Sequence, residues 1–298
     1  MFIRRVPKFD YHAPTSLPEA LDLLAKYGER ATVLAGGTDV IVAMKRREKV
    51  PENLINLKGI GALRGIEDHG GDGIRIGGLT SLGELERSRV LAERLPILWD
   101  AVKAMAAPQV RNIATIGGNL CSAVPSADTA PPLIALGASV KLAGSRGERR
   151  VLLEEFFVGP GESVLRSDEI LVEVWIPGQE PHSNGAYFKL MRRNALDLAL
   201  VGVAAYLTLD GKKGICKGAR IALGAVAPTP IRAPGAEKTL LHKEIDEERA
   251  REAGEAASQE ASPIGDIRAS REYRTEMIKV LTRKAVEKAH ERIRAGLG

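Results

Sequence analysis

Two short glycine-rich segments are the parts of this sequence best suited to bind a ligand. The first covers residues 35–39 (AGGTD) and the second covers residues 115–119 (TIGGN). Glycine lets backbone N–H groups approach a phosphate closely, and a helix that begins after such a turn adds a favourable potential for an anion. Either segment alone is more often a simple turn between two elements, so neither establishes a phosphate site by itself.

Taken together, the two segments predict a dinucleotide site, because two such turns could clamp one diphosphate from both sides. The usual nucleotide motifs are absent. Residues 71–76 (GDGIRI) lack the third glycine of a Rossmann G-x-G-x-x-G, and no G-x-x-x-x-G-K-[ST] phosphate loop is present. We therefore expect a dinucleotide that is held without a Rossmann fold.

The elements around the two segments mix helices and strands irregularly. A helix that opens at Ser16 with a capping box to Glu19, a strand at 31–35 and a helix at 40–45 frame the first segment. Strands are expected at 53–57, 74–78 and 170–176, and a helix at 96–107 ended by Pro108 precedes the second segment. The pattern has no regular βαβ alternation, so α+β is the expected class.

The last third of the chain reads as a separate lobe. Residues 178–185 (GQEPHSNG) form the best linker, and antiparallel strands follow, with a hairpin expected after Asp210-Gly211. An acidic helix comes next, and a final helix begins near Arg271 with Ser270 as its N-cap. This last helix carries a basic face, which we interpret as solvated rather than as a nucleic-acid surface.

Composition and charge fit a soluble globular protein. The chain has 298 residues, 44% hydrophobic and 27% charged, with a formal net charge of +5. Its first residues lack the apolar core of a secretion signal and no apolar run approaches a membrane span, so we expect a cytoplasmic protein. The two cysteines, Cys121 and Cys216, cannot supply an iron–sulfur cluster, and we expect no metal site on this chain.

At this point the sequence resembles the FAD domain of the molybdenum hydroxylases. The two glycine segments carry the resemblance, together with residues 125–128 (PSAD), 81–85 (SLGEL) and 108–112 (PQVRN). It implies a vanillyl-alcohol-oxidase (PCMH) type FAD domain over residues 1–177, with subdomains of about 1–57 and 58–177. A smaller α+β domain, the C-terminal domain of the molybdenum hydroxylase flavoproteins, would follow at 185–298.

The resemblance also implies a role and partners. A large subunit would carry a molybdopterin cofactor and oxidise the substrate, and a small subunit would carry two [2Fe–2S] clusters. This chain would be the electron-transfer subunit of such a heterotrimer, an oxidoreductase component that passes electrons from FAD to NAD or another acceptor. It would therefore hold no catalytic acid–base pair of its own. No histidine lies in either glycine segment, so the FAD is expected to be non-covalent.

Family roles carried over position by position give the expected FAD contacts. The diphosphate would be wrapped by Leu34, Ala35, Gly36, Gly37, Thr38, Asp39 and Val40, and the opposing wall would be formed by Thr115, Gly118 and Asn119. The remaining contacts are Val110 and Ala114 along the cavity, Asp128, Leu171 at the adenine side, Lys189 near the flavin, and Arg193, Asp197 and Leu198 beside the isoalloxazine ring. A cation at Lys189 would stabilise anionic reduced flavin.

Two of these residues could have a purely structural role, and the chain could have another function. Asp128 could be a simple turn or helix cap, and Lys189 could be a solvated surface lysine. The chain could instead be a free-standing FAD-dependent oxidoreductase with its own small substrate, which would need a catalytic acid that the C-terminal lobe does not display. A nucleotide-binding scaffold without redox activity is a third possibility, and the visible absorbance of bound FAD separates it from the other two.

Overall fold

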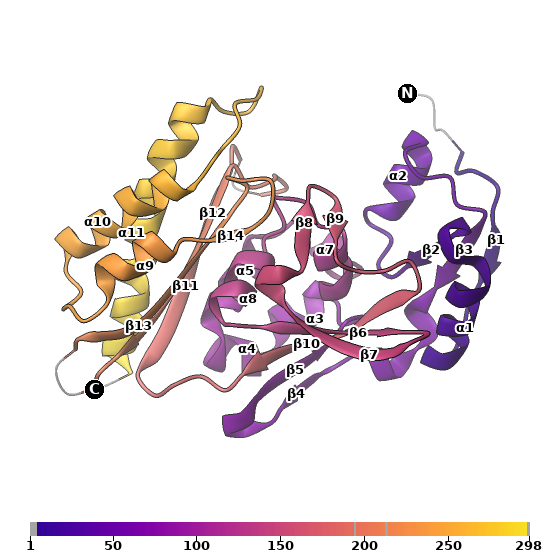
Figure 1. Cartoon of the computed structure of the whole chain (residues 1–298), viewed down its shortest axis with the longest axis horizontal. Helices are drawn as coiled ribbons and strands as arrows, with labels where there is room; N and C mark the ends of the chain where they lie inside the picture. The colour runs from indigo at the N-terminus through magenta and orange to yellow at the C-terminus, as the bar shows by residue number, and fades with distance from the viewer. Residues whose placement is uncertain (1–4, 194, 212–213, 297–298) are drawn as a thin grey trace.

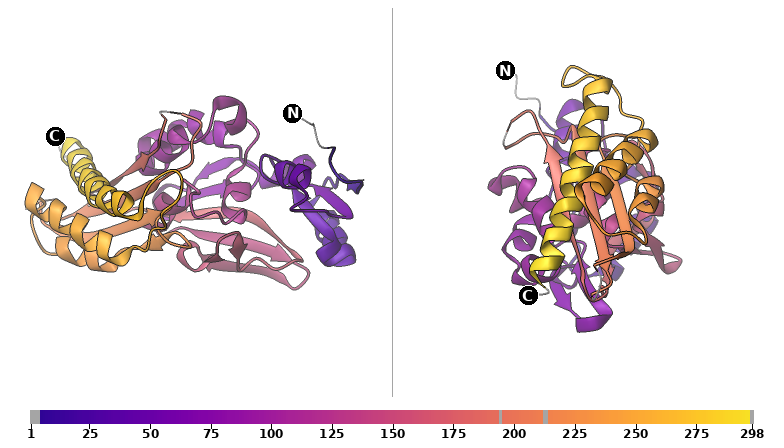
Figure 2. Two further views of the ribbon diagram at one scale, coloured as in Figure 1. Left: turned by 90° about the horizontal axis from the view of Figure 1, so that it is seen from above. Right: turned by 90° about the vertical axis from the view of Figure 1, so that its left-hand side faces the viewer.

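The computed structural model describes residues 5–193, 195–211 and 214–296. They form three regions that follow one another along an elongated molecule, from the N-terminal region at one end to the last helices at the other (Figure 1; Figure 2). Helices and sheets occur in every region, and the strands belong to separate sheets rather than to one doubly wound sheet. The expected α+β class is confirmed.

The N-terminal region is a three-stranded parallel sheet, in the order β1-β3-β2, with two helices. Its elements are β1 (Asp10–His12), α1 (Leu17–Tyr27), β2 (Ala31–Leu34), α2 (Val40–Arg46) and β3 (Asn53–Asn56). The Oγ of Ser16 accepts the amide of Glu19 at 3.4 Å, but the Glu19 carboxylate accepts the amide of Thr15 instead, at 2.8 Å. The expected capping box is therefore only half formed.

The middle region is built on an antiparallel sheet in the order β4-β5-β10-β6-β7. β10 returns from the end of the region to pair between β5 and β6, which closes the region on itself. Its strands are β4 (Ile66–Asp68), β5 (Gly73–Gly77), β6 (Ser139–Gly144), β7 (Gly147–Leu152) and β10 (Glu169–Pro177), with a small ladder of β8 (Phe157–Gly159) and β9 (Glu162–Ser163). Ile76, Val140 and Val174 are fully buried and carry the core of this sheet.

Six short helices pack over the middle sheet and share its core. They are α3 (Leu82–Arg87), α4 (Arg89–Arg94), α5 (Pro96–Ala104), α6 (Pro108–Arg111), α7 (Ile116–Cys121) and α8 (Ala130–Ala135), and short 3₁₀ turns lie at Gly28–Arg30, Leu57–Gly59, Gly61–Leu63, Gly70–Asp72 and Leu153–Glu155. Pro108 does not end α5, which stops at Ala104. It begins α6, because a proline at the first helical position removes an N–H that has no helical partner there.

The C-terminal region is a four-stranded antiparallel sheet in the order β11-β12-β13-β14, followed by helices. Its elements are β11 (Ser183–Leu190), β12 (Val201–Leu209), β13 (Cys216–Gly224), β14 (Ile231–Arg232), α9 (Pro234–Leu240), α10 (Glu247–Glu260) and α11 (Arg271–Ala295). β11 starts inside the expected linker. The pairing of β12 with β13 confirms the hairpin, although residues 212–213 of its turn lie outside the described residues. Ser270 caps α11 as expected, accepting the amide of Tyr273.

The C-terminal sheet is buried on both faces. Along β12, Val201, Val203 and Ala205 belong to the core formed with α9–α11, whereas Ala204 belongs to the core of the middle region. This alternation follows from the two-residue period of a strand. The sheet consequently lies between α9–α11 on one side and α5 and α8 on the other (Figure 1), and the middle and C-terminal regions share an interface. No helix among the described residues is long and apolar enough to cross a membrane.

Asp266 fixes the loop between α10 and α11. Its Oδ1 accepts a hydrogen bond from the buried guanidinium of Arg274 at 2.9 Å, and its Oδ2 accepts one from Arg268 at 2.6 Å. The pKa of Asp266 is lowered, chiefly by the Arg268 hydrogen bond and further by the amides of Arg268 and Ala269. Asp266 therefore stabilises the fold in its ionised form, above its unfolded pKa, and this contribution is lost as the pH falls through the lower folded value.

We expect Asp266→Asn to lower the free energy of unfolding at pH 7 by about 1–3 kcal/mol, because Arg274 loses a charged partner. The difference from the wild type should shrink when urea unfolding is repeated near pH 3, since Asp266 then takes up protons in the unfolded state while the folded state still holds it ionised. Asp72→Asn, at an exposed carboxylate, serves as the control. A gap that stays constant between the two pH values would contradict this account.

Candidate cofactor-binding site

The two glycine segments lie against each other. A Cβ atom placed on Gly36 would be 2.3 Å from the carbonyl oxygen of Ile113 and 2.8 Å from the Cα of Ala114. Only glycine permits so close an approach of two backbones. Gly37 follows with φ at +87°, a conformation that other residues rarely adopt. The turn after β2 is thereby held directly against the residues that lead into the second segment.

The backbone amides of the first segment are open. Among the described residues, no protein acceptor pairs with the amides of residues 36–39, and Asp39 makes no side-chain cap on α2. Consecutive free amides in a glycine turn form a concavity that suits an anion. Burial raises the pKa of Asp39, which reduces the charge that this carboxyl group sets against a neighbouring anion. The first segment therefore fits one half of a diphosphate cradle.

The second glycine segment is not the loop that its composition suggests. It forms the first turn of α7, and the Oγ1 of its N-cap Thr115 accepts the amide of Gly118 at 3.0 Å. The other amides already have carbonyl acceptors in the protein: Ile116 donates to Thr80 (3.0 Å), Gly117 to Gly78 (2.9 Å) and Asn119 to Thr115 (2.9 Å). The backbone amides of residues 116–119 are thus not free donors, and the expected symmetry of two amide cradles is wrong.

The Thr115 cap can be tested by an isosteric change. Thr115→Val removes the acceptor of the Gly118 amide at a position that is only 7% exposed. We expect the free energy of unfolding to fall by about 0.5–2 kcal/mol, the usual cost of losing an N-cap side chain. Thr115→Ser keeps the hydroxyl group and should lose much less in the same urea titration. A Thr115→Val variant as stable as the wild type would show that the cap contributes nothing.

The side chain of Asn119 carries the nearest alternative to a backbone amide donor on this side. Its Oδ1 accepts the hydroxyl of the fully buried Thr129 at 2.6 Å. Because the oxygen is used in this way, the NH2 group of the same side chain is left to meet a ligand. Thr129 thereby sets which end of the Asn119 amide is presented.

Asp128 and Lys189 form a buried ion pair, although 61 residues separate them. The Lys189 Nζ lies 2.8 Å from the Asp128 Oδ2, and the two side chains are 2% and 7% exposed. The Tyr187 hydroxyl donates to the Asp128 Oδ1 at 2.8 Å. Burial raises the pKa of Asp128, and the charge and hydrogen bond of Lys189 oppose that rise. Neither a solvated lysine nor a simple turn cap describes these residues.

The other expected contacts of the middle and N-terminal regions line the same neighbourhood. Ala114 is buried next to Gly36, and Val110 lies half-buried on α6. Leu171 is buried in β10, where its carbonyl oxygen approaches Gly78. Leu34 lies beneath the turn, with its Cδ1 3.0 Å from the position of a Cβ on Gly37, and Val40 packs on the same small core.

Arg193, Asp197 and Leu198 lie apart from these residues in the connection between β11 and β12. Arg193 donates to the carbonyl oxygen of Leu196 at 2.9 Å, and Asp197 accepts the amide of Arg192 at 3.1 Å. Leu198 is 56% exposed. Within the described residues, no hydrogen bond or ion pair joins this connection to either glycine segment. The structure thus does not unite the expected isoalloxazine contacts with the rest.

Two residues that support the candidate site are not predicted by the sequence analysis. Thr129 orients Asn119, and Tyr187 holds Asp128. A signal for Tyr187 was present, because residues two apart on a strand share a face, and Lys189 on β11 had been singled out. No sequence pattern linked Thr129 to Asn119, since the bond depends on how α7 and the following turn fold back.

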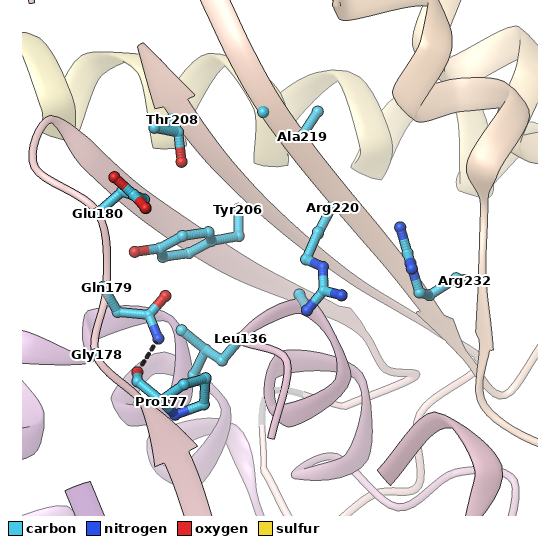
Figure 3. Close-up of a pocket in the computed structure, with 12 residues that line it drawn as sticks. Leu136, Pro177, Gly178, Gln179, Glu180, Tyr206, Thr208, Ala219, Arg220 and Arg232 are labelled. Carbon is cyan, nitrogen blue, oxygen red and sulfur yellow. Dashed lines mark hydrogen bonds between the residues drawn. The ribbon is translucent and has the colours of Figure 1, made fainter. Parts of the chain in front are cut away.

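A separate hollow lies elsewhere in the molecule. It measures about 300 Å³ and is bounded by the link between β10 and β11 and by the C-terminal sheet, with Tyr206, Arg220 and Arg232 on its wall (Figure 3). Arg232 is neutralised by Glu237 at 2.6 Å. None of the expected cofactor contacts lines this hollow, so it is distinct from the candidate site.

Ligands for a metal are not gathered in the described part of the chain, where no group of three or more His, Cys, Asp or Glu side chains lies close enough to hold an ion. Cys121 packs against the core of the middle region, and burial raises the pKa of its thiol to about 12. A thiol so far from ionisation behaves as a small apolar group.

The open amide turn between β2 and α2, packed against the residues that lead into α7, is suited to holding the diphosphate of a nucleotide. Family comparison makes this specific. Residues 7–179 match the model described as the FAD binding domain in molybdopterin dehydrogenase, and residues 186–289 match the CO dehydrogenase flavoprotein C-terminal domain. The chain belongs to the FAD-binding medium subunits of the molybdenum hydroxylase family, and its cofactor is FAD.

Individual relatives agree over nearly the whole chain. The medium chain of carbon monoxide dehydrogenase from Hydrogenophaga pseudoflava is 37% identical over 286 residues, which cover 96% of this chain and 98% of the relative. The putative xanthine dehydrogenase FAD-binding subunit of Escherichia coli K12 is 35% identical over 280 residues, with 94% and 95% coverage. These relatives are subunits of dehydrogenases, and this chain is likewise an oxidoreductase subunit.

Solved structures give the same result. A chain of the H. pseudoflava carbon monoxide dehydrogenase superposes with a TM-score of 0.92 at 37% identity, covering 97% of this chain and 99% of that one. A chain of quinoline 2-oxidoreductase from Pseudomonas putida 86 superposes with a TM-score of 0.90 at 33% identity, with 97% and 99% coverage. The fold of the three regions is therefore that of this family.

Proposed function

We propose that this chain relays electrons through FAD within a molybdenum hydroxylase complex. A large subunit with a molybdopterin cofactor would oxidise the substrate, and a small subunit with [2Fe–2S] clusters would deliver the electrons. FAD, when bound, accepts two electrons and releases them to NAD or to another acceptor. The observation that carries the proposal is the open amide turn at residues 36–39, packed against Ile113 in a chain of this family.

Each residue of the candidate site would make a different contact with FAD or support one that does. The amides of residues 36–39 would bind the diphosphate, with Leu34, Ala35 and Val40 shaping the turn beneath them. Thr115 and Gly118 would keep α7 in place, Asn119 would donate its NH2 group, and Val110, Ala114 and Leu171 would line the cavity with apolar surface. Direct donors of this kind bind best where no other acceptor competes for them.

At the isoalloxazine end of FAD, a buried ion pair would set the local electrostatic potential. The buried pair of Asp128 and Lys189 would lie near the isoalloxazine ring, where a cation favours the anionic form of reduced flavin. Arg193, Asp197 and Leu198 would close over the ring from the connection between β11 and β12. The exposed side chain of Leu198 would then be covered by the ring face, which would remove an apolar side chain from water.

The domain boundaries follow the same proposal. FAD would be bound by residues 1–177, in subdomains of about 1–57 and 58–177, and residues 185–298 would form the C-terminal domain. A heterotrimer that works in the cytoplasm is the assembly that we propose.

The experiment is to express the chain with an affinity tag in its native host and to analyse what co-purifies. The proposal expects a yellow complex with one larger and one smaller partner subunit. It should contain stoichiometric molybdenum, and iron in the ratio of two [2Fe–2S] clusters per FAD. Substrate added without an acceptor should bleach the flavin, and NAD should restore its absorbance if NAD is the acceptor. A yellow chain that purifies alone and turns over a small substrate would instead establish the free-standing oxidoreductase.

A further inference from the structure

A continuous line of buried contacts runs from the candidate FAD wall into the C-terminal sheet. It starts at Asn119 on α7, whose side-chain oxygen accepts the hydroxyl of Thr129 at 2.6 Å. The next residue is Asp128, which accepts the Tyr187 hydroxyl at 2.8 Å and the Lys189 ammonium group at 2.8 Å. Tyr187 and Lys189 belong to β11, so two regions of the molecule meet in this line.

The central groups of the line are constrained by burial, whereas Asn119 at its end is half-buried. Thr129 is 0%, Asp128 6% and Tyr187 6% exposed, so each would lose free energy if its partner withdrew. Burial and the negative charge of Asp128 raise the pKa of Tyr187 well above its usual value. The Tyr187 hydroxyl therefore stays protonated and can act only as the donor to Asp128.

We propose that Tyr187 is a positioning residue for FAD, which couples docking of the C-terminal sheet to cofactor binding. Its hydroxyl fixes the position of Asp128, and Thr129 is the next residue along the backbone. Thr129 in turn fixes the side-chain amide of Asn119 so that its NH2 group faces the ligand. Within the described part of the chain, no hydrogen bond joins Tyr187 to the residues expected to hold the diphosphate. The inference rests on the proposed site, since Asn119 is taken as an FAD contact.

Coupling of this kind is reciprocal. If docking of β11 prepares Asn119 for FAD, then bound FAD must stabilise the docked sheet by the same free energy. A residue with a purely structural role would lower the stability of the apoprotein and of the FAD complex equally. A positioning residue also reduces the additional stabilisation that FAD provides.

The test compares FAD affinity and FAD-induced stabilisation in the full chain. Tyr187→Phe keeps the ring and removes the hydroxyl, and we expect FAD affinity to fall by about 5- to 30-fold, because only part of the free energy of a hydrogen bond to a charged group is transmitted to the FAD site. The rise in melting temperature on adding saturating FAD should shrink as well. Thr129→Val interrupts the same line at another point and should weaken FAD binding in the same direction.

The double variant decides whether the two residues act through one line. Once Thr129→Val has released Asn119, the further loss of the Tyr187 hydroxyl should cost little affinity, so the two effects should not add. Effects that add fully would overturn the coupling. An unchanged FAD affinity in Tyr187→Phe would also overturn it.

Two control variants test whether any lost tyrosine hydroxyl, or any lost contact between the two regions, has the same effect. Tyr206→Phe deletes a tyrosine hydroxyl from the neighbouring strand, where it bonds to Ser183 of the same sheet at 2.6 Å. Glu154→Gln weakens a second contact between the same regions, the ion pair with Arg232 at 3.4 Å, which shares no residue with the line. Both should keep wild-type FAD affinity, and a loss in either equal to that of Tyr187→Phe would refute a specific role. A wild-type chain that refuses FAD would instead refute the proposed site itself.

Discussion

Replacing Gly36 with alanine should abolish most of the FAD binding of this chain. The added Cβ would lie 2.3 Å from the carbonyl oxygen of Ile113, far inside van der Waals contact, and the neighbouring atoms are backbone that cannot rotate away. The turn at residues 36–39 must therefore move off the segment leading to α7. We expect FAD affinity to fall by about 10- to 100-fold, which corresponds to the roughly 1–3 kcal/mol cost of overpacking.

Fluorescence titration of the apoprotein with FAD measures this effect, and circular dichroism checks that the fold survives. Gly61→Ala is the matched control, because a Cβ there meets nothing within 4 Å. Gly118→Ala should be milder than Gly36→Ala, since its Cβ would meet only the side-chain oxygen of Thr115, at 2.9 Å. A Gly36→Ala chain that binds FAD as tightly as the wild type would show that the cradle lies elsewhere.

The order of elements and the first glycine turn could be predicted from the sequence because their signals are local. The strand at 31–34, the turn and α2 are contiguous, and the Ser270 cap directly precedes the first residue of α11. Local composition misled at the second turn. Two adjacent glycines disfavour a helix by about 1 kcal/mol each, but the Thr115 cap and the packing of Gly117 on Gly78 override that preference.

Contacts between distant residues could not be read from single segments. Lys189 reaches Asp128 only because β11 presents alternate residues to the middle region, and the sequence states neither the face nor the partner. The family resemblance predicts that Asp128 and Lys189 both contact FAD, but it does not predict that they contact each other. The same limit hid Thr129, whose partner Asn119 lies ten residues earlier on another element.

Lys189→Met should destabilise the chain more than any other single substitution considered above. Methionine keeps the length and apolar stem of lysine but removes the charge, which leaves the 6% exposed carboxylate of Asp128 without its cation. Removing one partner of a buried ion pair typically costs about 3–5 kcal/mol. Urea unfolding at pH 7 measures this loss, and Lys279→Met, which breaks ion pairs with exposed glutamates, should cost much less.

The pH dependence of the Lys189→Met loss follows from Asp128. Burial already raises the pKa of this carboxyl group, and the variant loses the lysine that opposes the rise. A group with a raised folded pKa binds more protons in the native state than in the unfolded state, so stability falls as the pH rises through that value. The variant should accordingly lose less stability at pH 5 than at pH 8. A loss that is equal at both values would place its cause in packing rather than in charge.

Asp128→Asn added to Lys189→Met should recover much of the lost stability. The neutral amide still accepts the Tyr187 hydroxyl, and no isolated charge remains in the core. The double variant should therefore be more stable than Lys189→Met alone, a non-additivity that only a direct interaction between the two side chains produces. FAD binding would report separately on the cation. If the stable double variant binds FAD while its flavin potential falls, Lys189 stabilises reduced flavin as well as the fold.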